Sequence, residues 1–164
     1  MQINHTRIDD RLVHGQIVAA WLNDSQADTI LVADNKAAGD KMQQTLLKLA
    51  VPSRIKLIVE TIDGASKLIN DPSSKGKALL ILRNPETAYS LLEKGVSLDT
   101  INVGNISNSK SVVGRTKILQ NIFVEPNDVE YLKKIASKGV RLDVRAVPND
   151  KSIDGMELLS KHNL

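Results

Sequence analysis

Short aliphatic runs alternate with segments of helical periodicity along most of the chain. The runs that predict β-strands are Thr29–Ala33, Arg54–Val59, Lys77–Leu82, Thr100–Val103 and Asn121–Val124. The first four are apolar and bounded by turn residues, which is typical of strands covered on both faces of a sheet. Residues 140–147 alternate instead, with Val140, Leu142 and Val144 on one face, and this pattern predicts an edge strand.

Helix signals lie between these strands, in residues 41–50, 84–95, 125–139 and 152–162. The second segment has an N-cap residue, Asn84, followed by a proline, and it ends at Gly95. In the third, Asn127 and Glu130 have the spacing of a capping box. The fourth has a lower helix propensity because Gly155 interrupts it.

The order of these elements predicts the fold class. The first nine residues show little strand pattern of their own, and we interpret them as a strand because a helical pattern follows. Strand and helix then alternate without an obvious linker or repeat, which predicts one α/β domain over residues 1–164 with a mostly parallel sheet. Such sheets place their sites at the carboxyl ends of strands, so we search the loops after Ile8, Val59, Leu82 and Val103.

The composition narrows the possible chemistry. The chain has no cysteine, which excludes disulfides, thiolate catalysis and thiolate zinc sites and fits a reducing cytoplasm. No apolar run approaches the ~20 residues that cross a bilayer, and no secretory signal is visible. The net charge of +3 is spread without a Lys/Arg block and aromatics make up 2%, so we do not expect nucleic-acid binding.

The loop after the first strand reads DDRLVHGQ, residues 9–16. A helical pattern follows it, so we expect a helix to begin near Gly15 or Gln16. The first N–H groups of a helix lack intrahelical partners and attract anions, phosphate above all. His14 would lie beside these N–H groups and act as a nucleophile. Arg11 would supply positive charge, and Gly15 would allow the phosphate to approach the backbone closely. The alternative is that His14 is a polar capping residue and that the two aspartates mark a turn.

The same loop carries a resemblance to a known family. RIDDRLVHGQ, residues 7–16, closely resembles the signature of enzyme IIB of the mannose/fructose/sorbose family of the bacterial sugar phosphotransferase system (PTS). Residues 30–52, 79–105 and 138–150 also resemble successive parts of that family. The likeness therefore covers essentially the whole chain in order.

This resemblance implies an open sheet of about seven strands, one of them antiparallel, with helices on both faces. It implies a cytoplasmic phosphocarrier, peripherally associated with a membrane permease and without a metal or organic cofactor. A IIA protein, separate because this sequence carries no IIA portion, would phosphorylate Nδ1 of His14. The membrane subunits IIC and IID would then import the sugar as it receives the phosphoryl group. The supporting loop residues carried over are Asp9, Asp10, Arg11, Gly15 and Gln16.

The sugar and one supporting role are left open by the sequence. The family transports mannose, fructose, sorbose, glucose and acetylated amino sugars. The segment NVGNIS, residues 102–107, weakly favours N-acetylgalactosamine. A carboxylate facing a phosphate would repel it, so we expect Asp10 to tether Arg11 or the loop backbone. Simple loop capping is the alternative for Asp10.

Two further loops are candidates for the rim of the site. The fourth strand of a doubly wound sheet can lie beside the first, which would bring Arg83 and Asn84 near His14. Arg83 would contact phosphate or an acidic partner, or else be a solvated residue at a helix start. Gly104–Ser111 partly imitates a nucleotide-binding phosphate loop, but Ser109 replaces its second glycine, so we favour a polar rim loop.

The remaining features weigh against other functions. His5 lies in the predicted first strand where the family usually has an apolar residue, and His162 lies in the C-terminal tail. Neither has the carboxylate or histidine spacing of a metal site. A receiver-like signalling domain would need an Asp where Val59 and Glu60 stand. A non-catalytic small-ligand module using the loop after Val103 is the second alternative.

Overall fold

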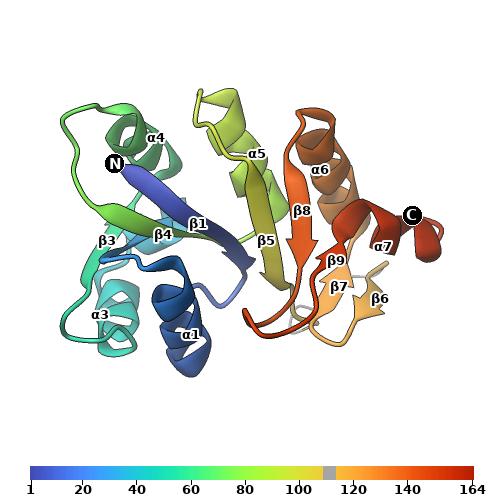
Figure 1. Ribbon diagram of the computed structural model, residues 1–164, viewed down its shortest axis with the longest axis horizontal. Helices are drawn as coiled ribbons and strands as arrows, with labels where there is room; N and C mark the ends of the chain where they lie inside the picture. Colours follow the sequence, from blue (N-terminus) through green and yellow to red (C-terminus); the bar gives the residue numbers. More distant parts are fainter. Residues whose placement is uncertain (109–113) are drawn as a thin grey trace.

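The structure is a computed structural model that describes residues 1–108 and 114–164. The strands are β1 (Gln2–Asp9), β2 (Thr29–Ala33), β3 (Lys56–Glu60), β4 (Lys77–Leu82), β5 (Thr100–Asn105), β6 (Thr116–Leu119), β7 (Ile122–Val124), β8 (Arg141–Val144) and β9 (Ile153–Asp154). The helices are α1 (Gly15–Ser25), α2 (Asn35–Ala38), α3 (Lys41–Leu49), α4 (Ile62–Asn70), α5 (Pro85–Glu93), α6 (Pro126–Ser137) and α7 (Gly155–Lys161). Figure 1 shows the strands side by side in one curved sheet, with the small β6–β7 hairpin beyond its edge.

The sheet confirms the predicted architecture. Its seven strands follow the order β3-β2-β4-β1-β5-β8-β9 in the described part of the chain. All its neighbours are parallel except β8 and β9. Helices separate the parallel strands because a parallel connection must cross over the sheet.

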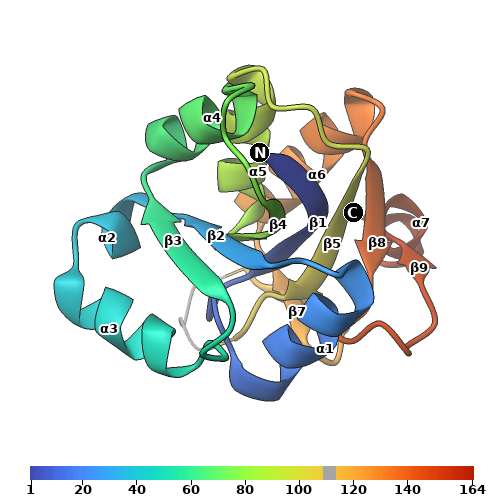
Figure 2. The same ribbon diagram turned by 60° about the vertical axis from the view of Figure 1, so that its left-hand side comes forward.

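Helices cover both faces of the sheet, as predicted. Side chains on β4 point alternately to the two sides: Leu79 and Ile81 join one core cluster, and Leu80 and Leu82 join the other. The first cluster packs against α1, α2 and α3, and the second against α4, α5, α6 and α7. Figure 2 shows α1 and α3 below the sheet, with α4, α5 and α6 above it.

Two predictions about the sheet edges were wrong. The segment Arg54–Val59 was expected to be covered on both faces, but it contributes β3, which ends the sheet and is only half-buried. The segment 140–147 was expected at an edge, but β8 pairs on both sides, with β5 and β9. Its alternation misled because Asp143 is polar yet buried, where it accepts hydrogen bonds from Ser152 Oγ and Arg145 Nε.

The helix boundaries follow local chemistry, with two corrections. Asn84 caps α5 as predicted, accepting a hydrogen bond from the Thr87 backbone N–H at 2.9 Å. The capping box of α6 is not formed by Asn127 and Glu130; it is formed two residues earlier, by Glu125 and Asp128. Gly155 does not interrupt α7 but begins it, just after the cap residue Asp154.

Candidate functional site

The strand order places a crevice at the carboxyl ends of β1 and β5. From β1 the chain crosses through α1 to β2 on one side, and from β5 it continues through α6 to β8 on the other side. The two connections lie on opposite faces of the sheet. Such a switch point is where open α/β sheets bind ligands, and it puts the β1–α1 loop beside the loop that leaves β5.

Buried side chains fix the β1–α1 loop just before its histidine. Leu12 has a left-handed backbone with φ of 61°, and its N–H donates to the Asp9 carbonyl at 2.9 Å. Leu12 and Val13 are both buried in the cluster under α1. A leucine rarely adopts this conformation, so its packing holds the turn in place. Two residues later, His14 lies at the surface.

His14 stands at the N-cap of α1, with its imidazole exposed. Its carbonyl accepts the first helical hydrogen bond, from Val18 N–H at 3.1 Å. Within the described residues no side chain caps this helix, and its first turn carries no acid. No described atom lies within 4 Å of the position where Gly15 would carry a Cβ. The first-turn amides of α1, including that of Gln16, are therefore exposed at the helix start that the sequence predicts, and such groups attract anions.

Asp9 holds two arginines, one on each side of it. Its carboxylate accepts from Arg7 Nη2 at 2.9 Å, and Arg7 and Asp9 are each 1% exposed. It also accepts from the backbone N–H, Nε and Nη2 of Arg11, each at 3.0 Å. These hydrogen bonds raise the pKa of Arg11, so its guanidinium stays charged. Nη1 of Arg11 has no hydrogen-bond partner in the described part of the chain, and the Arg11 side chain is 36% exposed.

Asp10 ties the first loop to the loop after β5. Its carboxylate accepts from Asn105 Nδ2 at 2.8 Å, from Ser107 N–H at 2.9 Å and from Ser107 Oγ at 2.5 Å. Asp10 was expected to tether Arg11 or the loop backbone. In the described residues it instead accepts hydrogen bonds from the Asn105 side chain and from both the backbone and the hydroxyl of Ser107. Both carboxylates are occupied by donors, which limits their repulsion of a phosphate.

Arg83 lies under the same loop, as the neighbouring positions of β4 and β1 require. It forms a bidentate ion pair with Asp34, at 2.8 Å from each oxygen, and it donates to the Asp10 carbonyl at 3.4 Å. Burial alone would raise the pKa of Asp34, but the hydrogen bonds from Arg83 and Ala37 N–H outweigh it and lower that pKa. Arg83 is therefore a partly buried residue paired with an acid of its own chain, not a freely solvated one. Asn84 is used as the α5 cap.

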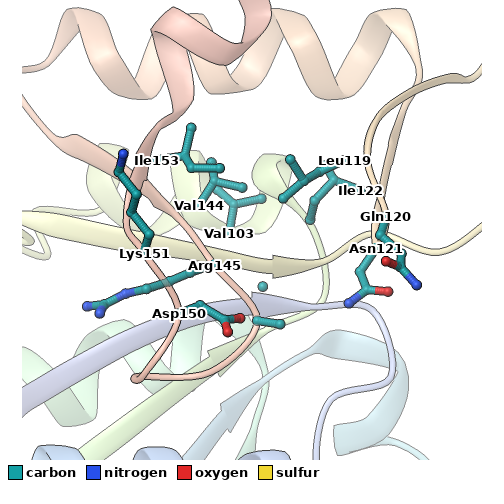
Figure 3. A pocket seen from close by; sticks show the side chains of 12 residues that line it. Val103, Leu119, Gln120, Asn121, Ile122, Val144, Arg145, Asp150, Lys151 and Ile153 are labelled. Atoms are coloured by element: carbon teal, nitrogen blue, oxygen red, sulfur yellow. The ribbon is translucent and has the colours of Figure 1, made fainter.

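The β5 exit adjoins a hollow of about 400 Å³ on the side away from β1. Figure 3 shows its aliphatic lining, which comprises Val103, Leu119, Ile122, Val144 and Ile153. Arg145 and Lys151 line one side of it and Gln120 and Asn121 the other. Gly104 also lines the hollow. A side chain does not fit at this position, because a Cβ there would lie 1.8 Å from Nη1 of Arg7. The comparison with a nucleotide-binding phosphate loop depends on Ser109, Lys110 and Ser111. These residues lie outside the described part of the chain.

The other histidines have different surroundings. His5 stacks on Trp21 with ring centroids 4.1 Å apart, and burial lowers its pKa to about 4. His162 is exposed at the end of α7. Among the residues that the structure describes, no three His, Cys, Asp or Glu side chains are grouped to hold a metal. No helix in the same residues has the length and hydropathy of a membrane span.

Sequence reasoning missed several residues that build the site. Arg7 and Asp34 were not selected, Asn105 and Ser107 were selected only as part of the loop Gly104–Ser111, and Asp9 was carried over without a role. One signal was available for Arg7: it lies two residues before Asp9 on β1, and side chains two residues apart on a strand share a face. The partners from β2 and β5 depend on strand order, which local patterns do not specify.

The fold and this loop define an α/β protein with an exposed histidine at an uncapped helix start. A family model described as PTS system sorbose subfamily IIB component matches residues 3–164. The chain therefore belongs to the sorbose-type IIB components of the sugar phosphotransferase system. It is a phosphotransferase that transfers phosphoryl groups to sugar and works with IIA and membrane IIC and IID components. This excludes the receiver-like and non-catalytic alternatives.

Individual relatives agree over nearly the full chain. The fructose-specific EIIB component of Bacillus subtilis (strain 168) is 34% identical over 160 residues, covering 97% of this chain and 96% of that protein. The mannose-specific EIIAB component of Escherichia coli K12 is 32% identical over 162 residues, covering 98% of this chain. This chain spans only 49% of the length of that EIIAB protein.

Solved structures give the same result. The IIB domain of the Klebsiella pneumoniae sorbose permease superposes with a TM-score of 0.91 at 26% identity, with 98% of both chains covered. The N-acetylgalactosamine-specific IIB component 1 of Escherichia coli has a TM-score of 0.85 at 32% identity. That comparison covers 92% of this chain and 97% of the other.

Proposed function

We propose that His14 is the residue that carries the phosphoryl group. The observation that supports this most strongly is its exposed imidazole at an uncapped helix start, in the same loop as the partly exposed Arg11. A neutral imidazole nitrogen attacks the phosphorus atom of a phosphohistidine on the IIA donor. The new N–P bond forms at Nδ1 of His14 as the donor's N–P bond breaks. In the second half of the cycle a sugar hydroxyl attacks the same phosphorus and restores the imidazole.

The surrounding loop supplies charge and geometry rather than acid or base chemistry. Phosphoryl transfer depends on in-line positioning and on stabilising charge on the equatorial oxygens. The N–H groups of Gly15 and Gln16 and the guanidinium of Arg11 provide that stabilisation. Asp10 holds the neighbouring loop, and Arg83 holds the backbone of Asp10, so both are positioning residues.

The sugar, the location and the extent of the domain form a second part of the proposal. Relatives named for fructose, mannose and N-acetylgalactosamine are 32–34% identical to this chain, which does not separate them. We propose a hexose or acetylated amino-hexose as acceptor, with N-acetylgalactosamine as the first to test. Residues 1–164 act as one domain on the cytoplasmic side, meeting a phosphorylated IIA donor and the IIC and IID subunits in turn.

The experiment is to phosphorylate this protein with a labelled phospho-IIA partner and map the label. We expect an acid-labile, base-stable phosphate on His14 and no label on His14→Ala. His5→Phe and His162→Ala serve as matched controls and should accept phosphate at the wild-type rate. Label on His5 or His162, with His14 unmodified, would overturn the assignment.

A further inference from the structure

Helix α3 exposes three large apolar side chains on one face. Met42, Leu46 and Leu49 are 77%, 62% and 79% exposed, whereas Leu47 on the opposite face is buried. Single exposed apolar residues are ordinary on protein surfaces, but a contiguous row on one helix is typical of an interaction surface. We refer to Met42, Leu46 and Leu49 as the α3 stripe.

The segment that carries this stripe has an excess of positive charge. Residues 35–57 contain five of the 22 basic residues and one of the 19 acidic residues, a net charge of +4. The rest of the chain therefore has a net charge of −1. The net charge of +3 for the whole chain does not reveal this local excess. The five basic residues are Lys36, Lys41, Lys48, Arg54 and Lys56.

These cations have no ion-pair partner within the described part of the chain. The one acid of the segment, Asp40, is used at the start of α3, where it accepts from Gln43 N–H at 3.0 Å. The ammonium groups of Lys41 and Lys48 lie on the same helix as the stripe. The surface therefore combines apolar side chains with unneutralised positive charge.

A groove extends this surface to the edge of the sheet. It has a volume of about 730 Å³ and runs between α3 and β3. Leu49, Leu57 and Val59 contribute apolar lining, and Lys48 and Lys56 line it from the helix and the strand. The stripe thus continues into a recess with cations on two sides.

The surface lies on the same face of the sheet as the loop that carries His14. Leu47 of α3 packs in one core cluster with Leu12 and Val13, which directly precede His14. Figure 2 shows α3 and α1 together below the sheet, with α3 outermost. The α3 stripe and the His14 loop therefore belong to elements on the same side of the sheet.

We infer that the α3 stripe and its lysines dock this protein on an anionic lipid surface. An apolar helix face bordered by lysines is the pattern of helices that lie in a membrane interface, and anionic headgroups attract such cations. A bilayer accepts protruding side chains without a matching cavity, which favours lipid over a folded protein partner. Few inserted residues give reversible binding, which suits a carrier that alternates between a donor and a membrane permease. The inference uses the proposed function only to explain why a carrier needs reversible membrane binding.

The test measures binding of the full chain to phosphatidylglycerol/phosphatidylcholine vesicles by sedimentation, with pure phosphatidylcholine vesicles alongside. We expect binding to the anionic vesicles that weakens as salt is raised. The variant Met42→Gln/Leu46→Gln/Leu49→Gln should bind about tenfold more weakly or worse, because its apolar insertion is lost. Lys41→Gln/Lys48→Gln should also bind more weakly. Lys75→Gln/Lys161→Gln, with the same loss of charge elsewhere on the surface, should bind as the wild type does.

Absence of wild-type binding, or equal binding by the stripe variant, overturns the inference. Loss of sugar phosphorylation by the stripe variant with permease in detergent, where no bilayer is present, also overturns it and assigns the stripe to a protein contact. His14→Ala keeps α3 intact and should bind vesicles normally. Vesicle binding and phosphoryl acceptance from IIA therefore fail independently, so the two proposals are distinguished.

Discussion

Two histidines near the start of the chain have opposite surroundings. His5 lies on β1, stacked on Trp21, and its Nε2 is buried without a hydrogen-bond partner in the described residues. His14 lies at the start of α1 with its ring in solvent and first-turn amides beside it. The same side chain is thus held neutral and enclosed in one place and is accessible to a partner in the other. Residue type alone does not identify a phosphoryl acceptor; its access and electrostatic surroundings do.

Asp9 connects these two regions. Through Arg7 it reaches the Trp21 ring, which lies 5.8 Å from the Arg7 guanidinium carbon, and through Arg11 it reaches the His14 loop. Burial lowers the pKa of Arg7, so that arginine depends on Asp9 to remain charged at low cost.

The largest expected effect on stability comes from removing the charge that both regions share. Asp9→Asn leaves the buried Arg7 without its anion and should lower the free energy of unfolding by about 3–5 kcal/mol. Chemical denaturation at pH 7 measures this. Asp63→Asn breaks the exposed pair between Asp63 and Lys94 and should lower the free energy of unfolding far less, because solvent screens exposed pairs. Equal losses in the two variants would show that Asp9 is not a structural link.

Removing the exposed arginine affects the His14 region alone. Arg11→Ala should slow phosphoryl acceptance about 10²-fold, because a positioned charged donor to the phosphoryl oxygens is lost. The free energy of unfolding should change by less than about 1 kcal/mol, since Asp9 keeps Arg7. Arg11→Lys should recover only part of the rate, because lysine cannot reproduce the bidentate geometry. An unchanged rate in Arg11→Ala would remove this residue from the mechanism.

The His5 region should respond to pH. The folded pKa of His5 is about 4, below its ordinary value of 6.5, so the unfolded chain takes up the proton first. Its contribution to stability is complete above pH 6.5 and is lost as pH falls toward 4, by up to about 3 kcal/mol. His5→Phe keeps the stack on Trp21 and should flatten this part of the stability–pH curve. Curves of the same slope in both proteins would contradict the assignment.

The smallest expected effect tests the approach to the helix start. Gly15→Ala places a methyl group where no described atom lies within 4 Å, so the fold should be unchanged or up to about 1 kcal/mol more stable. Phosphoryl acceptance should slow several-fold, because the methyl group stands in the path to the first-turn amides. A faster or equal transfer rate would mean that phosphate does not approach there.

Local sequence signals predicted much of the fold. Apolar runs identified β2 and β4 with their observed bounds, because a strand buried on both faces is apolar at every position. The cap chemistry around Asn84 and Gly95 set both ends of α5. Helix α4 was not predicted. Asn127 was wrongly assigned to a capping box and Gly155 to a helix interior, because the role of a residue at a helix end depends on which nearby backbone groups lack hydrogen-bond partners. The edge strands were misassigned because pairing involves residues far apart in sequence.

The sequence by itself determined the α/β class, the resemblance to IIB components and the position of His14 at the start of a helix. Each of these is encoded within a few neighbouring residues by apolar periodicity, cap residues or a continuous motif. Only the tertiary structure decided that Asp10 binds Ser107, that Arg83 binds Asp34, and that His5 is enclosed. It also decided that the α3 stripe remains in solvent, since helical spacing alone cannot tell a core-facing row from an exposed one. These features depend on strand order and burial, which arise only when distant segments pack together.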